Sequence, residues 1–170
     1  MIDRRVFFVS TAGLALLAVL RGPSLPQARA GEKRGLKFEI EKSPDEWRKQ
    51  LSPAQYRILR EEGTEPPGSS PLLAEHRKGT FSCAGCDLPL FASETKFESG
   101  TGWPSFYQPL ENAVGESRDA KFGMVRTEIH CRRCGGHLGH VFDDGPKPTG
   151  LRYCMDGLAL VFHPATPSAT

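Results

Sequence analysis

The sequence predicts a mainly β domain with short helices at its N-terminal side. The chain has 170 residues, of which 38% are hydrophobic and 25% are charged, as is typical of one soluble globular domain. Its 18 glycines and 14 prolines favour turns and short strands over long helices. Turn residues recur often after Gly79, and the chain has no long internal repeat.

The first 30 residues have the three parts of a targeting segment. Arg4 and Arg5 supply a cationic start, residues 6–20 form an apolar stretch, and residues 28–30 (Ala-Arg-Ala) fit a small-x-small cleavage site. We expect cleavage after residue 30; the alternatives are an uncleaved membrane anchor flanked by Arg21 and a buried core helix. The paired arginines resemble a twin-arginine export signal, so the expected location is the bacterial periplasm.

The positive net charge of the chain belongs to this leader. Removing its four arginines and one aspartate leaves 18 basic and 19 acidic residues, a net charge of −1 in place of +2. A near-neutral mature chain has no electrostatic footprint for nucleic acid and no polybasic patch for lipid. We therefore expect neither nucleic-acid binding nor stable membrane insertion of the mature form.

Two helix starts precede the cysteine-bearing part of the chain. Ser-Pro-Asp-Glu at 43–46 and Ser-Pro-Ala-Gln at 52–55 each combine a serine N-cap with proline at the first helical position and a Glu or Gln two residues further on. We expect helices at 44–50 and 53–62, the second ended by Gly63. Their apolar residues should dock them on the domain. These residues are Trp47, Leu51, Tyr56 and Leu59.

Two later segments have strand patterns. Residues 124–130 alternate Val125, Thr127 and Ile129 with other side chains, which predicts a half-buried strand. Residues 158–162 form a continuous apolar run, which predicts a fully buried strand. Both patterns agree with the mainly β fold.

Four of the five cysteines form two C-x-x-C pairs, each with glycine in or just after its turn. They are Cys83, Cys86, Cys131 and Cys134. Two such turns can present four thiolates to one ion, the tetrahedral shell that zinc favours, and a closed sulfur shell indicates one structural zinc. The 44 intervening residues exceed the ~15–20 of a compact zinc ribbon, so the metal would join two distant segments. Disulfides and a redox-active C-x-x-C are the alternatives.

The fifth cysteine, Cys154, lies in GLRYCMDGLAL at residues 150–160. Together with GTGWPSF at 100–106 and CRRCGGHLGHVFDDGP at 131–146, this segment resembles the methionine-R-sulfoxide reductase family, also called type B. The likeness spans about residues 36–164, and the two C-x-x-C pairs extend it.

The resemblance implies two antiparallel β-sheets with N-terminal helices and a structural zinc. It implies reduction of the R epimer of methionine sulfoxide, in oxidised proteins or as the free amino acid, without a bound organic cofactor. The reductase domain would span residues 43–165, with a polar lead at 31–42 and a tail at 166–170.

The family pattern also implies site residues. Cys154 is the nucleophile, Trp103 forms part of the pocket for the substrate's methyl group, and three further residues share the site. These are His137, His140 and Arg152. Thiolate attack on a sulfoxide needs a proton for the departing oxygen, which histidine can supply. Arg152, two residues before Cys154, would lie on the same side of a strand and favour the thiolate.

Two positions depart from the commonest family pattern. Thr101 stands where many members carry a cysteine that forms a disulfide with the oxidised nucleophile, so we expect an external, thioredoxin-like thiol to reduce the sulfenic acid on Cys154. Asp156, which we assign to substrate binding, stands where asparagine is usual, and its charge should oppose thiolate formation. Asp156 could instead hold a protonated His140 or offset Arg152.

Two other functions stay open from the residues alone: a non-enzymatic, exported zinc-ribbon binding module, and a thiol-based peroxide sensor built around Cys154. Of the remaining aromatic residues, we expect Phe106 and Phe142 to lie in the core. Three histidines are expected to be surface or structural groups. They are His76, His130 and His163.

Overall fold

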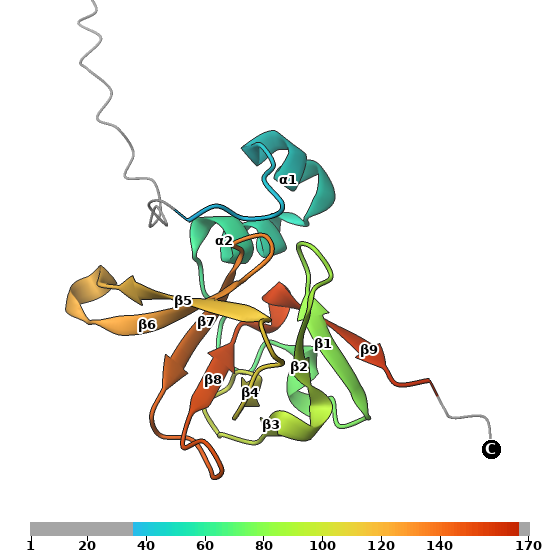
Figure 1. The fold of residues 1–170 in the computed structure, drawn as a ribbon, viewed down its shortest axis with the longest axis vertical. Helices are drawn as coiled ribbons and strands as arrows, with labels where there is room; N and C mark the ends of the chain where they lie inside the picture. The colour runs from blue at the N-terminus through green and yellow to red at the C-terminus, as the bar shows by residue number, and fades with distance from the viewer. Residues whose placement is uncertain (1–35, 167–170) are drawn as a thin grey trace, which may run out of the picture.

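The structure is a computed structural model that describes residues 36–166. Two antiparallel sheets form the body, with both α-helices at one end of them (Figure 1). The smaller sheet has the strand order β2-β1-β9. Its strands are β1 (Gly79–Cys83), β2 (Pro89–Ala92) and β9 (Leu160–Pro164). The mainly β fold with two antiparallel sheets is therefore confirmed.

The larger sheet has six strands in the order β3-β4-β8-β7-β6-β5. They are β3 (Lys96–Phe97), β4 (Ser105–Phe106), β8 (Arg152–Met155), β7 (His137–Phe142), β6 (Arg126–Cys131) and β5 (Val114–Asp119). Four short 3-10 helices connect elements. They are η1 (Pro71–Ala74), η2 (Ser93–Thr95), η3 (Lys121–Gly123) and η4 (Gly157–Ala159).

Both α-helices begin where the sequence predicts. Ser43 and Ser52 form capping boxes, in which each serine side chain accepts the N3 amide and the N3 side chain accepts the serine amide. The first helix, α1, has its predicted bounds, Pro44–Gln50. The second, α2, spans Pro53–Glu61 and ends earlier than predicted, because Glu62 adopts a left-handed conformation with φ of 53°.

The helices dock through the predicted apolar residues. Trp47, Leu51 and Leu59 are buried, and Tyr56 is half-buried. The helix α2 packs against β7 and η4. In α1, Gln50 Nε2 donates a 2.6 Å hydrogen bond to the Gly85 carbonyl, which fastens this helix to the first C-x-x-C turn.

Both predicted strands form with shifted bounds. The strand β6 begins two residues later than predicted, because η3 ends with the Met124 amide donating to the Lys121 carbonyl at 3.2 Å. The fully buried strand predicted at 158–162 is wrong. Its first residues belong to η4, and only Leu160 of β9 is buried.

Aromatic packing joins the two sheets. Phe91 of β2 stacks on Phe106 of β4 with ring centroids 4.4 Å apart, and Phe81 of β1 meets Phe106 edge-on at 5.0 Å. All three rings are fully buried, so the core position of Phe106 is confirmed. The core position predicted for Phe142 is wrong, because this ring is half-buried beneath the Arg152 guanidinium, 4.4 Å from its centroid.

The three remaining histidines differ in exposure. His76 and His163 lie on the surface, and His163 Nε2 is 2.7 Å from Asp87 Oδ1. His130 is buried and edge-on to the Phe38 ring. All three lie in surface or structural positions, as predicted.

The predicted export segment, the first part of the polar lead and the last four residues lie outside the described part of the chain. Within residues 36–166, no helix has the length and apolar composition that a membrane crossing requires.

Candidate active site

The four paired cysteines converge at one point between the two sheets. Cys83 ends β1 and Cys131 ends β6, and each is followed by the turn that carries its pair partner. The turns close through amides donating to cysteine carbonyls, from Asp87 to Cys83 at 2.8 Å and from Gly135 to Cys131 at 2.9 Å. Asp87 and Gly135 adopt left-handed backbone conformations, which reverse the chain.

The sulfur geometry of this cluster fits a tetrahedral metal site. All four Sγ atoms lie within 4.8 Å of one another. Cys83 and Cys134 are 3.7 Å apart, and Cys86 and Cys131 are 3.5 Å apart. Zinc–sulfur bonds of about 2.3 Å in a tetrahedron place sulfur atoms about 3.8 Å apart. The four cysteines can therefore hold one metal ion that ties β1 of the smaller sheet to β6 of the larger.

Cys154 lies elsewhere, in β8 of the larger sheet. Its register partners are Ser105 on β4 and His140 on β7. Side chains directly opposite one another on antiparallel strands lie about 4.5–5.5 Å apart at Cβ, so both neighbours flank the thiol. A Cβ added at Gly139 would come within 2.1 Å of the Cys154 carbonyl, so only glycine allows β7 to approach β8 here.

A small pocket of about 110 Å³ opens beside Cys154. Its lining includes Trp103, Arg126, His140, Phe142, Cys154 and Asp156. The structure thus brings together four of the residues that the sequence analysis assigned to the site, and adds Phe142 in place of its predicted core position.

Several neighbours act on the ionisation of Cys154. Burial raises the pKa of its thiol, and the nearby charge of Asp156 adds to this rise. Hydrogen bonding by Thr101, whose Oγ1 lies 3.8 Å from Cys154 Sγ, and the positive charge of Arg152 act in the opposite direction. The net pKa is raised, so the environment alone does not provide a fully ionised thiol.

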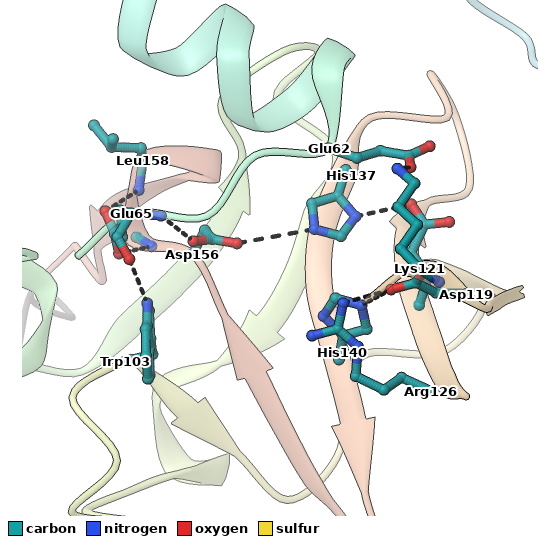
Figure 2. A network of polar contacts seen from close by, with 12 residues as sticks. Glu62, Glu65, Trp103, Asp119, Lys121, Arg126, His137, His140, Asp156 and Leu158 are labelled. Atoms are coloured by element: carbon teal, nitrogen blue, oxygen red, sulfur yellow. Dashed lines mark hydrogen bonds and ion pairs between the residues drawn. The ribbon is translucent and has the colours of Figure 1, made fainter. Parts of the chain in front are cut away.

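His140 is bonded to a carboxylate that the sequence analysis did not single out. Its Nε2 lies 2.8 Å from Asp119 Oδ2, which also receives the Arg126 guanidinium at 2.6 Å (Figure 2). Burial alone would raise the pKa of Asp119, but hydrogen bonds from the Lys121 amide, His140 and Arg126 outweigh it and hold the pKa at about 2. The ionised Asp119, and not Asp156, is therefore the carboxylate partner of His140.

His140 is accordingly a neutral ring beside the nucleophile. Burial lowers its pKa, although the hydrogen bond to Asp119 acts in the opposite direction. Because Nε2–H donates to Asp119, the other ring nitrogen is left as an acceptor. Such a ring can take a proton from Cys154 more readily than it can give one to a substrate.

His137 lies deeper than His140 and bridges two acidic residues. Its Nδ1 is 2.8 Å from Glu128 Oε1. Its Nε2 is 3.9 Å from Asp156 Oδ2 (Figure 2). The side chain is only 2% exposed, and Nε2 has no hydrogen-bond partner within the described residues. The separation of 3.9 Å between Nε2 and Asp156 is too long for a direct hydrogen bond.

Asp156 is a buried carboxyl group at the end of β8. Its Oδ1 accepts the Glu65 amide at 2.8 Å, and the side chain is 4% exposed. Burial raises the pKa of Asp156 to about 6, against the lowering effects of the Glu65 amide and His137. Asp156 therefore carries a proton over a range in which an ordinary aspartate has lost it.

Arg152 is held in place by the carboxylate of Asp144. Its Nε and one terminal nitrogen donate to the two oxygens of Asp144, both at 2.8 Å. These hydrogen bonds raise the pKa of Arg152, whereas burial of the guanidinium acts to lower it. The bidentate contact fixes the guanidinium over Phe142, so its charge stays near Cys154.

Glu65 is a site residue that sequence reasoning missed. Its buried carboxylate accepts the amides of Gly157 at 2.5 Å and Leu158 at 3.2 Å. Its own amide donates to Asp156, and its carbonyl accepts Trp103 Nε1 at 3.1 Å (Figure 2). One residue thus connects the indole wall of the pocket to Asp156 and to η4.

The comparisons with known proteins agree with this geometry. The SelR domain matches residues 51–164. A peptide methionine sulfoxide reductase MsrB of Agrobacterium fabrum is 58% identical over 127 residues, which are 74% of this chain and 94% of the relative. One from Leptospira interrogans is 54% identical over 128 residues, or 75% and 98% of the two chains. One from Thiobacillus denitrificans is 56% identical over 124 residues, or 72% and 94%.

The family resemblance seen in the sequence is thereby confirmed. The domain match covers both C-x-x-C pairs, the pocket and Cys154, and the relatives are matched over nearly their whole length. The chain belongs to the SelR-domain family of peptide methionine sulfoxide reductases, type B.

Proposed function

We propose that the chain reduces the R epimer of methionine sulfoxide, in oxidised proteins or as the free amino acid, with Cys154 as the nucleophile. The observation that carries this proposal is the position of Cys154 on a small pocket whose other walls include Trp103 and His140. Relatives that are 54–58% identical bear the name peptide methionine sulfoxide reductase, which supports the reaction class.

The pocket suits one sulfoxide side chain. Its volume of about 110 Å³ leaves room for little more. The indole of Trp103 offers an apolar face for the S-methyl group, and sulfur–aromatic contacts add to that attraction. The hydrogen bond from Trp103 Nε1 to Glu65 fixes the orientation of the face.

The first half-reaction transfers the sulfoxide oxygen to Cys154. The neutral His140 accepts the thiol proton, and the thiolate attacks the sulfoxide sulfur while the substrate oxygen gains a proton. Asp156, whose pKa is raised to about 6, can take up a proton next to the pocket and pass it to the substrate oxygen. The substrate loses its sulfur–oxygen bond and is reduced by two electrons, while Cys154 is oxidised by two electrons to a sulfenic acid.

The second half-reaction needs a thiol from outside the chain. Thr101 stands beside Cys154 and carries no thiol, and the four other cysteines lie together in the metal cluster. A thioredoxin-like partner forms a mixed disulfide with Cys154 and releases water. A second thiol of the partner then restores Cys154 and leaves the partner as a disulfide.

A peroxide sensor and a non-enzymatic binding module are not favoured. Neither function requires the reductase motifs, and the chain shares those motifs with relatives named as reductases.

The test follows dabsyl-labelled methionine sulfoxide of each epimer by chromatography, with a dithiol as reductant. The wild type should convert the R epimer and leave the S epimer, and Cys154→Ser should convert neither. Thr95→Val serves as the control, because Thr95 bonds to the Ala92 carbonyl away from the pocket. Equal turnover of both epimers, or an active Cys154→Ser, would rule out the assignment.

Zinc is the metal that we propose for the four-cysteine cluster, because it favours a tetrahedral sulfur shell and the sulfur spacing suits it. When bound, zinc supplies no open coordination position, so its contribution is structural.

Export to the periplasm is proposed from residues 1–30 alone. Replacing Arg4 and Arg5 with lysine should stop export by the twin-arginine route. Cell fractionation of the native host checks this proposal, and full-length protein in the cytosol of the wild type would contradict it.

A further inference from the structure

Three hydroxyl side chains form a continuous line of hydrogen bonds that ends at Cys154. Ser105 Oγ lies 2.7 Å from Ser99 Oγ, and Ser99 Oγ lies 2.8 Å from Thr101 Oγ1. Thr101 Oγ1 is in turn 3.8 Å from Cys154 Sγ. At the far end, Ser105 Oγ is 3.1 Å from the Trp103 carbonyl, to which it can donate.

The line is held in place by the fold. Ser105 is 1% exposed and lies in register with Cys154 on the adjacent strand. Ser99 Oγ also accepts the Thr101 amide at 3.4 Å. Ser99 and Thr101 are half-buried. Water therefore competes little for the Ser105 hydroxyl group and has partial access to the other two residues.

Each hydroxyl group has one proton to donate, so the line has two possible directions. With Cys154 as a thiol, the sulfur donates to Thr101, Thr101 to Ser99, and Ser99 to Ser105. Ser105 then donates to the Trp103 carbonyl. Every proton in the line has an acceptor.

Loss of the Cys154 proton reverses the line. Thr101 then donates to the sulfur, Ser99 to Thr101, and Ser105 to Ser99. The anion gains a hydrogen bond, and only the bond to the Trp103 carbonyl is given up. Hydrogen bonds to an ionised acceptor are stronger than those to a neutral one, so the reversed line favours the thiolate.

We propose that Thr101, Ser99 and Ser105 are positioning residues whose hydroxyl line reverses when Cys154 loses its proton and thereby stabilises the attacking thiolate. The consequence of this reversal for turnover rests on the proposed function of Cys154. The ionisation of the thiol can be measured without any turnover.

Ser105, the register partner of Cys154, also hydrogen-bonds directly to the thiol and lowers its pKa. Other groups around Cys154 act on the same ionisation. Arg152 on β8 favours the thiolate, but Asp144 shares its charge. Asp156, beyond the end of β8, opposes the thiolate, and the neutral His140 on β7 faces it. The hydroxyl line differs from these groups because it carries no net charge.

The test measures the pKa of Cys154 in the zinc-loaded full chain from the pH dependence of alkylation by iodoacetamide, with the modified peptide identified by mass spectrometry. Thr101→Val removes the hydroxyl at nearly constant volume, and Ser99→Ala breaks the line one step further away. Thr101→Ser keeps the hydroxyl group. Thr95→Val is the matched control, since its hydroxyl bonds only to the Ala92 carbonyl.

Thr101→Val should raise the pKa of Cys154 by about one unit, so that alkylation at neutral pH slows about tenfold. Ser99→Ala should cause a smaller rise, and Thr101→Ser and Thr95→Val should leave the value close to that of the wild type. Unchanged values in both Thr101→Val and Ser99→Ala, at an unchanged melting temperature, would overturn the proposal. An equal rise in Thr95→Val would also overturn it.

The same experiment separates the two proposals. If the variants shift the pKa of Cys154 while the wild type fails to reduce methionine sulfoxide, the hydroxyl line stands and the proposed function fails.

Discussion

The four paired cysteines and Cys154 place the same side chain in opposite surroundings. The paired sulfur atoms crowd within 4.8 Å of one another at the ends of β1 and β6. The sulfur of Cys154 faces a hydroxyl group, a guanidinium group and a pocket. Convergence allows the paired thiols to hold a metal ion, whereas Cys154 lies apart from them beside a pocket. The fold keeps the four clustered thiols and the proposed nucleophile separate in this way.

The largest expected effect comes from breaking the metal cluster. Cys83→Ser should abolish metal binding and lower the free energy of unfolding by on the order of 4 kcal/mol, because metal binding is coupled to folding and the cluster ties the two sheets together. Metal analysis and thermal unfolding check this prediction. Cys154→Ser is the matched control and should keep both the metal and the melting temperature. A metal-free native protein with two disulfides would contradict the account.

A smaller effect is expected at Glu65, on the other side of the comparison. Glu65→Ala leaves the buried Gly157 amide and the half-buried Leu158 amide without their acceptor and should lower the free energy of unfolding by about 1.5–3 kcal/mol. It should also raise KM more than it lowers kcat, because the side chain anchors the Glu65 backbone, and the carbonyl of that backbone accepts Trp103 Nε1. Glu65→Gln should recover part of the lost stability and part of the lost substrate affinity.

Steady-state kinetics and denaturant unfolding of both Glu65 variants check this prediction. Glu98→Gln is the control, since Glu98 pairs with Lys96 and is largely exposed. Equal effects of Glu98→Gln and Glu65→Gln would contradict the role given to Glu65.

The smallest expected effect concerns the pH dependence of stability. Because the pKa of Asp156 rises from its ordinary 3.8 to about 6 on folding, the folded state binds this proton more tightly than the unfolded state does. Stability should therefore fall as pH rises from about 4 to 6. Asp156→Asn should remove this fall. At pH 7 the free energy of unfolding of the variant should exceed that of the wild type by on the order of 2 kcal/mol, and below pH 4 the two values should differ little.

Denaturant unfolding of the wild type and Asp156→Asn at pH 4 and pH 7 measures this difference. Parallel pH profiles of the two proteins would show that Asp156 does not carry the effect.

The two thiol environments also differ in how far sequence could predict them. Each C-x-x-C turn contains its own geometry, so its spacing predicts a pair of metal ligands, whereas the meeting of the two turns depends on the fold. The helix starts follow in the same way, because Ser43 and Ser52 act on amides three residues away. Local patterns of this kind carry their structural meaning within a few residues.

The Cys154 pocket required a family resemblance, because its parts meet only through sheet register and loop packing. Asp119 on β5 meets His140 on β7 across the intervening strand β6, and no local sequence pattern predicts this contact. Glu65 acts on residues more than 90 positions away. Phe142 is an apolar residue of a type that usually lies in the core, but its ring packs against the Arg152 guanidinium at the pocket.

The boundary errors have local physical causes. Sequence pattern does not distinguish an apolar 3-10 turn from the start of a strand, so the run at 158–162 was assigned to one strand. The burial of β9 depends on what the rest of the fold packs against it, which no property of the run itself determines.

The central claim is that Cys154 reacts alone while the other four cysteines are closed to it. Reduced, zinc-loaded protein receives one equivalent of methionine-R-sulfoxide without a reductant, followed by dimedone and peptide mass spectrometry. We predict one dimedone adduct per chain, on Cys154. Thr101→Cys should instead lose two thiols as a disulfide joining positions 101 and 154, because Thr101 already contacts the sulfur. A wild type that loses two thiols and yields a peptide joining Cys154 to one of the paired cysteines would contradict the claim.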